Sequence, residues 1–490
     1  MDLVSLGKNL LEQLEYNPLQ PLLFNSGFFL FFFIFILVFY RFVWQNHRAK
    51  VFFLTTMSLY FYYKSSGIFF LLIVISSIID FIAGKYIHET EVQVKRKLLL
   101  VVSLVMNLGI LGYFKYTNFF LDTLNQIGAG NFDMLDIFLP VGVSFFTFQS
   151  MSYTIDIYRR NLDPEKNFID FIFFVSFFPQ LVAGPIVRAA DFLPQIKNEV
   201  FISKADLGRA LFLIIAGLLK KAVIADYISI NFVDRVFEWP TRFTGVENLM
   251  ALYGYTIQLY CDFSGYSDMA IGLALLLGFR LPINFNAPYK AASITEFWQR
   301  WHISLSSWLR DYLYIGLGGN RKGNARTYVN LILTMLLGGL WHGASWRMAI
   351  WGLIHGTALA VERFFGIKKW TDKSRLNRII GFVVTLNLFT FTLLLFRAQS
   401  HQLAIDMMLQ IWNYFHPEVF FQFIEGYTLV FILILIGYIT HFTPQKLENK
   451  IQEMITNLPF VGKAILITLV IWVVAQFKSA DIQPFIYFQF

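Results

Sequence analysis

The sequence contains few charged residues, and this shortage excludes an ordinary soluble domain. Asp, Glu, Lys and Arg make up 15% of the 490 residues, while 56% are hydrophobic and 18% are aromatic. A soluble globular chain carries about 25% charged residues. The composition therefore predicts a protein embedded in a lipid bilayer, in which the 56 phenylalanines face lipid or fill the core.

Cysteine is nearly absent, and so are the common motifs of soluble enzymes. The single cysteine, Cys261, excludes an intramolecular disulfide and a multi-cysteine metal site. No His-x-x-x-His or His-Glu-x-x-His spacing occurs, so we expect no metal. A Gly-x-x-x-x-Gly-Lys-Ser/Thr loop and a Gly-x-Ser-x-Gly elbow are also missing, which argues against nucleotide hydrolysis and serine-esterase chemistry.

Long apolar runs predict an all-α polytopic protein, a single integral-membrane domain over residues 1–490. We expect about ten to thirteen spanning and re-entrant helices. The first run has no cleavage site and should be retained as a helix. The runs at 51–63, 137–155 and 247–278 are shorter or interrupted by polar residues, which favours re-entrant or tilted segments. The span-length runs lie at 23–44, 66–84, 97–117, 168–186, 206–226, 327–343, 344–362, 379–397, 427–443 and 462–477.

Basic residues gather in short loops beside these runs, so the net charge of +8 indicates a positive-inside bias rather than nucleic-acid binding. Placing these loops in the cytoplasm sends the last predicted span outward. The C-terminal tail, residues 481–490, is then extracytoplasmic. The basic groups lie at 41–50, 95–97, 363–378 and 446–450.

The segment 282–326 is too polar to span, and its middle predicts an interfacial or re-entrant helix. Ser293 and Glu296 fit a capping box that opens this helix. It should run to Tyr312 and place Trp298 and His302 on one face, since they are four residues apart. His302 would thereby be carried toward the membrane interior.

Three histidines are candidates for chemistry. His342 lies in an apolar run between Gly338 and Trp346, and an ionisable group at that depth is costly unless it has a function. An imidazole there could act as a general base. The alternative is a structural histidine bonded to a neighbouring helix. His302 could equally be an interfacial anchor, and His355 is expected to pack or to support the site.

Two further features leave both a structural and a functional interpretation open. Asp262 and Asp268 place carboxylates in an apolar region, and a structural network with Arg280 or Arg300 is the favoured interpretation. The aromatic tail 485–490 could be an interfacial anchor. In the functional interpretation, the Tyr487 phenol is a nucleophile that points back into the membrane.

Taken together, these residues resemble the membrane-bound O-acyltransferase (MBOAT) family, in particular its bacterial branch with the alginate O-acetylation and teichoic-acid D-alanyl transfer proteins. The resemblance covers about residues 140–360 and the chain end. In combination and in this order the matching pieces are specific. They are residues 262–268, 282–289, 297–306 and 340–343.

The resemblance implies a ring of helices around a central funnel and an intramembrane acyl transfer. His342 matches the catalytic histidine of the family, and His302 matches a second position that is often Asn in other branches. Tyr487 matches a tyrosine proposed to take the acyl group at the outer face. Supporting roles would fall to Asp262, Asp268, Arg300, Trp301 and Trp341.

The expected function is transfer of an acetyl group across the bacterial inner membrane to an extracellular or cell-wall polysaccharide. Cytoplasmic acetyl-CoA would be the donor, with no bound cofactor, and a periplasmic or membrane-anchored SGNH-type acetyltransferase would be the partner. D-alanyl transfer to teichoic acid and O-acetylation of peptidoglycan are the alternatives. A transporter with histidine proton relays is a further rival, but the inverted repeats expected of one are not found in the sequence.

Overall fold

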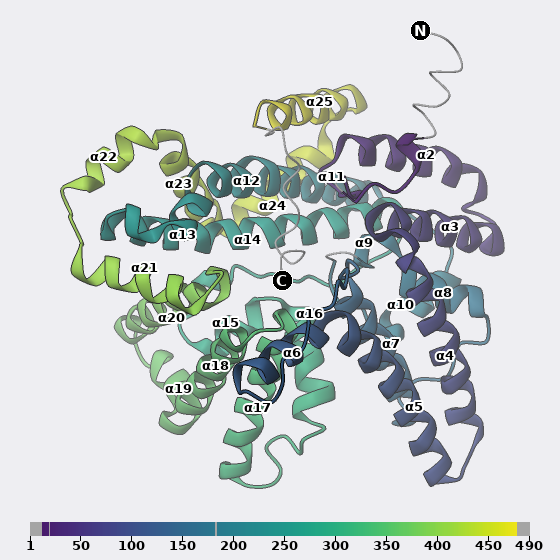
Figure 1. Cartoon of the computed structure of the whole chain (residues 1–490). Helices are drawn as coiled ribbons and strands as arrows, with labels where there is room; N and C mark the ends of the chain where they lie inside the picture. The colour runs from purple at the N-terminus through teal and green to yellow at the C-terminus, as the bar shows by residue number, and fades with distance from the viewer. Residues whose placement is uncertain (1–11, 19, 182–183, 478–490) are drawn as a thin grey trace. The chain divides into compact units, whose positions relative to one another are not determined.

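Helices make up nearly all of the regular structure in the computed structural model, which describes residues 12–18, 20–181 and 184–477 (Figure 1). No strand occurs among these residues. The chain divides into two compact units. Unit 1 runs to Asp206 and includes Leu273–Pro282, and unit 2 comprises Leu207–Gly272 and the residues from Ile283 onward.

Unit 1 is built from helices of the first 200 residues. They are α2 (Gly27–Val43), α3 (His47–Ser66), η1 (Gly67–Phe69), α4 (Phe70–Glu89), α5 (Gln93–Leu111), η2 (Gly112–Tyr116), α6 (Thr117–Gln126), α7 (Val143–Tyr158), α8 (Phe168–Ser176), α9 (Phe178–Leu181) and α10 (Ala189–Lys197).

Polar side chains join three of these helices inside unit 1. Asp80 on α4 is fully buried and accepts hydrogen bonds from Ser103 Oγ at 2.6 Å and Asn107 Nδ2 at 2.8 Å, both on α5. Ser103 also bonds to Thr154 Oγ1 on α7 at 3.0 Å. Because apolar helices gain little from contact with each other in lipid, such bonds help to fix their packing.

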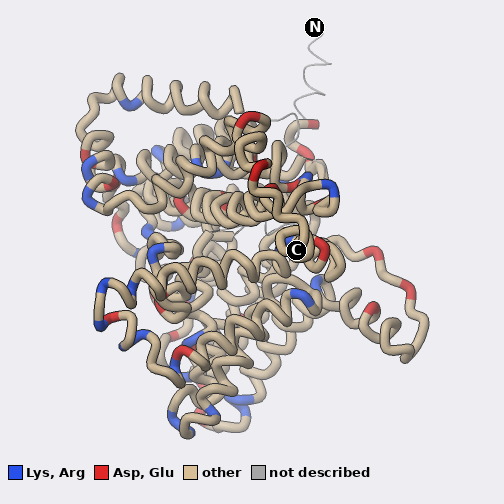
Figure 2. The backbone as a smooth tube through the Cα atoms, turned by 90° about the vertical axis from the view of Figure 1, so that its left-hand side faces the viewer, with Lys and Arg blue, Asp and Glu red and all other residues tan. Residues whose placement is uncertain are grey.

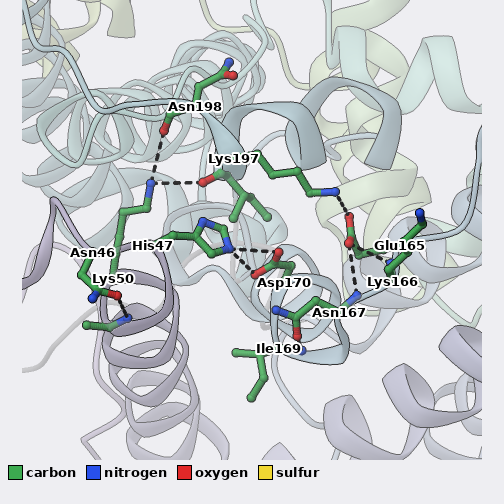
Figure 3. Close-up of polar contacts among 12 residues, drawn as sticks. Asn46, His47, Lys50, Glu165, Lys166, Asn167, Ile169, Asp170, Lys197 and Asn198 are labelled. Carbon is green, nitrogen blue, oxygen red and sulfur yellow. Dashed lines mark hydrogen bonds and ion pairs between the residues drawn. The ribbon is translucent and has the colours of Figure 1, made fainter.

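A second polar cluster fastens the start of α3 to α8 (Figure 3). His47 Nε2 lies 3.1 Å from both carboxylate oxygens of Asp170. One turn along α3, the buried Lys50 donates to the carbonyl oxygens of Ile196 at 3.1 Å and Asn198 at 3.4 Å. Side-chain hydrogen bonds, to a carboxylate and to backbone carbonyls, therefore hold these helix ends of unit 1 together.

Unit 2 begins within α11 and contains the remaining helices, except that the last turn of α14, from Leu273 to Leu276, belongs to unit 1. They are α11 (Lys204–Leu218), η3 (Leu219–Ala225), α12 (Asp226–Ile228), η4 (Ser229–Val233), α13 (Asp234–Glu238), η5 (Pro240–Arg242), α14 (Gly245–Leu276), η6 (Pro288–Lys290), α15 (Ile294–Arg300), α16 (Ile303–Trp308), η7 (Leu309–Tyr314), α17 (Asn324–His342), α18 (Trp346–Phe365), α19 (Ile367–Thr371), α20 (Arg375–Arg397), α21 (His401–Asn413), α22 (Val419–Gly426), α23 (Thr428–Phe442), α24 (Gln445–Asn457) and α25 (Phe460–Phe477).

Four helical stretches of the described residues are long and apolar enough to cross a membrane, and a fifth is added if α22 and α23, bent by 95°, form one broken span. In Figure 2 the charged residues lie mostly at helix ends and in connections, with long uncharged stretches between them. The all-α, multi-pass class is confirmed, while the ring around a funnel stays a prediction. The four stretches are His47–Glu89, Gln93–Gln126, Arg375–Arg397 and Phe460–Phe477.

Two predicted runs can be compared with the observed helices. The run 247–278, interrupted by polar residues in the sequence, lies mostly in the continuous 32-residue helix α14, and cationic side chains of η3 pair with its carboxylates. A re-entrant or tilted course for this segment stays a prediction. The run 168–186, expected to span, is helical in α8 only to Ser176. Phe177 leaves the helical region with ψ of 109°, and a separate short helix, α9, begins at Phe178. Pro179 lacks a backbone N–H, so it is tolerated in the first turn of a helix but not in the interior of a longer one.

Glycines bring α17 and α18 into close contact within unit 2. A Cβ atom on Gly339 would collide with the carbonyl oxygen of Met348 and with Gly352, and one on Gly352 would collide with the carbonyl of Met335. Close approach of two backbones requires residues without side chains. The pair therefore forms a fixed support, and its connecting turn follows directly after His342.

Candidate functional site

His342 is the last residue of α17, and its side chain is buried. The helix stops there because Gly343 is extended, with φ of −155° and ψ of 141°. Ser345 then caps α18 by accepting a hydrogen bond from the Met348 N–H at 3.4 Å. The end of α17 and the capped start of α18 therefore fix the backbone position of His342.

His302 lies in a break between two helices, and the single helix predicted through Tyr312 is wrong at this point. α15 ends at Arg300 and α16 begins at Ile303. His302 itself adopts φ of 43° and ψ of 55°, the left-handed conformation. Trp298 and His302 consequently do not share a helical face. The side chain of His302 is fully buried.

The structure brings His302 and His342 together in unit 2. Their ring centres are 6.4 Å apart, and the Trp341 ring lies 6.1 Å from His302 and 5.1 Å from His342. This separation is too long for a direct hydrogen bond between the two imidazoles. Both rings can therefore act on one reacting group only if it lies between them.

Aromatic side chains enclose the histidine pair. The Phe263 ring meets His302 edge-on at 4.7 Å and 88°. Trp351 and Phe396 lie 5.3 and 5.6 Å from His342, between ring centres. An apolar wall of this kind lowers the local dielectric, which strengthens interactions with charge that develops during a reaction.

His355 lies one turn beyond Trp351 on α18 and contacts its ring at 4.6 Å. Its Nε2 atom bonds to Thr392 Oγ1 at 3.1 Å, and Thr392 donates its hydroxyl hydrogen to the carbonyl of Phe389 at 2.7 Å. Trp351 thus separates His355 from His342. This placement agrees with the predicted packing or supporting role for His355.

Asp262 and Asp268 have partners other than the predicted Arg280 or Arg300. Lys221 Nζ lies 2.5 Å from Asp262 and 2.6 Å from Asp226, and it is only 1% exposed. Lys220 Nζ lies 2.8 Å from Asp268. Both lysines belong to the π-helical segment η3, which packs against α14. The carboxylates are paired, and their cations come from a different element than predicted. A structural rather than a functional role for this network stays a prediction.

The remaining predicted residues fall into three groups. Trp301 is buried and stacks on Phe297 at 5.7 Å and 15°, whereas Trp341 touches both candidate histidines. Arg300 pairs with Glu296 at 2.8 Å. Tyr487 lies outside the described residues.

Two residues of this region were missed by the sequence analysis. Asn284 is buried and lies 3.1 Å from His302, between Oδ1 and Nδ1. His441 on α23 is also buried, and its Nε2 accepts the Tyr289 N–H at 3.1 Å. The motif 282–289 contains both Asn284 and Tyr289, so its match to the family was the available signal for this contact region.

Among the residues that the structure describes, no three His, Cys, Asp or Glu side chains lie close enough together to hold a metal ion. Two buried imidazoles near one point are suited to moving a proton to or from a hydroxyl or thiol. The geometry therefore favours acid–base chemistry at His342 and His302.

The chain is similar to a known protein family and to several known proteins. The sequence pattern of the membrane-bound O-acyltransferase family matches residues 98–398, wider on both sides than the predicted core of 140–360. A peptidoglycan O-acetyltransferase of Helicobacter pylori is 38% identical over 417 residues, which is 79% of each chain. A probable alginate O-acetylase, AlgI, of Pseudomonas aeruginosa is 48% identical over 63% of this chain and 59% of its own.

A teichoic acid D-alanyltransferase of Bacillus subtilis is more distant, at 29% identity over 52% of this chain and 68% of its own. The family pattern covers most of the chain, including both candidate histidines and the helices next to them. The protein is a multi-pass membrane O-acyltransferase and belongs to the membrane-bound O-acyltransferase family.

Proposed function

We propose that this enzyme transfers an acetyl group from acetyl-CoA toward a polysaccharide outside the cytoplasm, with His342 as the general base and His302 as its helper. The observation that carries the proposal is the buried pair of imidazoles, 6.4 Å apart between ring centres, inside the region matched by the family. Two relatives named as O-acetyltransferases of cell-wall or exopolysaccharides support acetyl as the acyl group.

The proposed step converts a thioester into an oxygen ester. His342 removes the proton from the acceptor hydroxyl, whose oxygen attacks the thioester carbonyl carbon. A carbon–oxygen bond forms, the carbon–sulfur bond breaks, and the departing thiolate receives the proton from His342. The products are an oxygen ester and free CoA. His302 would stabilise the reacting group from the other side.

We further propose that the first acceptor is the Tyr487 phenol. The product would be an acetyl-tyrosine at the outer face, and a second enzyme of the SGNH type would then move the acetyl group to a sugar hydroxyl. This scheme requires the tail 481–490 to lie outside the cytoplasm and the protein to reside in the bacterial inner membrane. The distribution of Lys and Arg in short loops supports this orientation.

The acceptor polysaccharide has two candidates. The Helicobacter pylori relative matches 79% of this chain and acts on peptidoglycan by its name, whereas the alginate relatives reach 48% identity over a shorter part. Both relations favour acetyl transfer over D-alanyl transfer, since the D-alanyltransferase is only 29% identical over 52% of the chain.

The test is the intact mass of the purified protein after incubation with labelled acetyl-CoA, comparing wild type with Tyr487→Phe and His342→Ala. We expect one acetyl group on wild type and none on either variant. Since both substitutions could act on folding, Tyr427→Phe and His416→Ala serve as matched controls and should keep the label. Tyr427 caps α23, and His416 lies in the exposed connection before α22.

Each other outcome would change a different part of the proposed mechanism. A label that survives Tyr487→Phe but not His342→Ala would place the covalent acceptor elsewhere. A label that survives His342→Ala would refute the general-base role. No label on wild type, together with acetylation of added polysaccharide, would replace the relay by direct transfer.

A further inference from the structure

Asn284 belongs to a loop that is hydrogen-bonded to the backbone on both sides of His302. Its carbonyl oxygen accepts the Ile303 N–H at 2.9 Å, just after the histidine. Two residues further, the Asn286 N–H donates to the Arg300 carbonyl at 2.9 Å, just before it. The loop 284–286 therefore holds both flanks of the helix break within unit 2.

The side-chain amide of Asn284 has only one orientation that suits its neighbours. The oxygen Oδ1 faces the Ser304 backbone N–H at 3.3 Å and the Ser304 hydroxyl at 2.9 Å, and Nδ2 faces Ser267 Oγ at 3.2 Å. A backbone N–H can only donate a hydrogen bond. Turning the amide over would set two donors against each other, so Oδ1 is the atom on the His302 side.

This orientation determines which nitrogen of His302 carries the hydrogen. Oδ1 accepts, so His302 Nδ1, 3.1 Å away, must donate. In a neutral imidazole the other nitrogen is then the acceptor. Nε2, on the far side of the ring from Asn284, is therefore the nitrogen with the lone pair. The Phe263 ring, edge-on at 4.7 Å, restricts rotation of the imidazole.

The backbone of His302 needs the same support. A non-glycine residue in the left-handed region costs on the order of 1–2 kcal/mol and persists only where its surroundings impose it. Asn284 supplies three of the bonds that impose it, through its carbonyl oxygen to Ile303 and its side-chain oxygen to Ser304. One buried residue thus fixes both the conformation and the tautomer of His302.

We propose that Asn284 is a positioning residue that holds His302 as the Nδ1–H tautomer, so that Nε2 is the nitrogen that can accept a hydrogen bond from the reacting group during acyl transfer. This inference rests on the proposed function. It adds a residue that need not touch the acyl group, and it assigns the hydrogen-bond-accepting atom of the second histidine.

The test compares Asn284→Asp and Asn284→Ala with wild type in the pH dependence of kcat/KM for acetyl transfer. Asp keeps the acceptor for Nδ1–H and adds a negative charge, which favours the protonated ring. We expect its acid limb to move to higher pH, with activity retained on the alkaline side. Ala removes the acceptor, and we expect a loss of about 10–100-fold, the range seen when a partner that orients a histidine is removed.

The matched control is Asn286→Ala, the same chemical change two residues away, because the contacts of Asn286 with Arg300 use main-chain atoms that alanine keeps. It should retain the wild-type pH profile. A purely structural role predicts that Asp and Ala lower activity equally with no change in the pH profile, and that result overturns the proposal. If wild type itself fails to transfer acetyl, the proposed function is wrong, whereas an active wild type with unaffected Asn284 variants refutes only this inference.

Discussion

At the scale of single residues, the buried histidines differ in what fixes them. His302 is held by the amide of Asn284, and His355 by the hydroxyl of Thr392. The Thr392 hydrogen is committed to the Phe389 carbonyl, so its oxygen must accept from His355 Nε2–H. Each imidazole therefore has a defined tautomer, and in each case the partner comes from a different element than the histidine.

Thr392→Val removes the acceptor of the His355 N–H without changing the shape of the side chain. A buried donor left without its partner costs about 1–3 kcal/mol. We expect a lower melting temperature in detergent, measured by thermal unfolding, with acetyl transfer reduced only in proportion to the folded protein. Thr392→Ser keeps the hydroxyl and should stay near wild type. A large loss of kcat in fully folded Thr392→Val would instead give His355 a direct part in the reaction.

At the scale of helices, the close contact between α17 and α18 depends on glycines, which have no side chain. Gly339→Ala places a Cβ atom against the Met348 carbonyl and the Gly352 backbone. Forcing extra volume into a packed contact costs about 1–3 kcal/mol, and backbone atoms cannot move aside as a flexible side chain can. We expect a clear drop in thermal stability and in activity, since His342 ends the same helix.

Gly109→Ala is the control for this prediction. Gly109 lies within α5, and a Cβ atom there would meet no atom within 4 Å. Alanine is favoured over glycine in a helix by about 1 kcal/mol, so this variant should be as stable as wild type or slightly more stable. Equal stability of the two variants would contradict the role of close packing.

The carboxylate of Glu296 accepts a hydrogen bond from the Ala292 N–H at the start of α15. The contribution of Glu296 to the stability of the protein should therefore depend on pH. Burial alone would raise the pKa of Glu296, but hydrogen bonds from the Ala292 N–H and Arg300 and the charges of Arg300 and Arg378 hold that pKa below its ordinary value. A depressed carboxyl pKa contributes stability above the unfolded-state value, and the contribution disappears as pH falls through the folded-state value.

Glu296→Gln should therefore be less stable than wild type at neutral pH, by about 0.5–2 kcal/mol for a weakened helix cap. The difference should shrink as pH is lowered below the ordinary carboxyl range, because wild type loses the same charge. Thermal unfolding at several pH values measures this. A constant difference across pH would mean that shape rather than charge is responsible.

The sequence allowed several elements to be predicted, but not the break at His302. The predicted runs at 379–397 and 462–477 lie within α20 and α25, because an uninterrupted apolar run of span length leaves few alternatives in a bilayer. The stretch from Ser293 to Tyr312 is also helical in pattern, and the predicted cap at Ser293 is confirmed by its bond to the Glu296 N–H at 3.0 Å. What interrupts this helix is a tertiary contact with Asn284, which local periodicity cannot register.

At the scale of the whole molecule, the family match from 98 to 398 includes residues of both compact units. The candidate histidines, their aromatic wall and the paired lysines all belong to unit 2. Unit 1 has its own buried polar contacts around Asp80 and Asp170. The residues proposed to carry out the reaction therefore occupy one unit of the chain.

Membrane orientation can be tested with single cysteines, because the only native one, Cys261, is buried. We expect Asp481→Cys to react with a membrane-impermeant maleimide in intact cells, and Lys369→Cys to react only after the inner membrane is permeabilised. The reason is the basic group at 363–378, which favours the cytoplasmic side. The reverse labelling pattern would refute the proposed orientation and, with it, a relay through Tyr487 at the outer face.

The left-handed backbone of His302 also affects how substitutions there should be read. Asparagine tolerates this conformation better than other residues with side chains, whereas alanine is strained in it. His302→Ala thus combines loss of the imidazole with a distorted chain, while His302→Asn removes the ring and spares the backbone. The same preference makes asparagine the replacement expected to disturb this turn least, because few other side chains fit the left-handed conformation without strain.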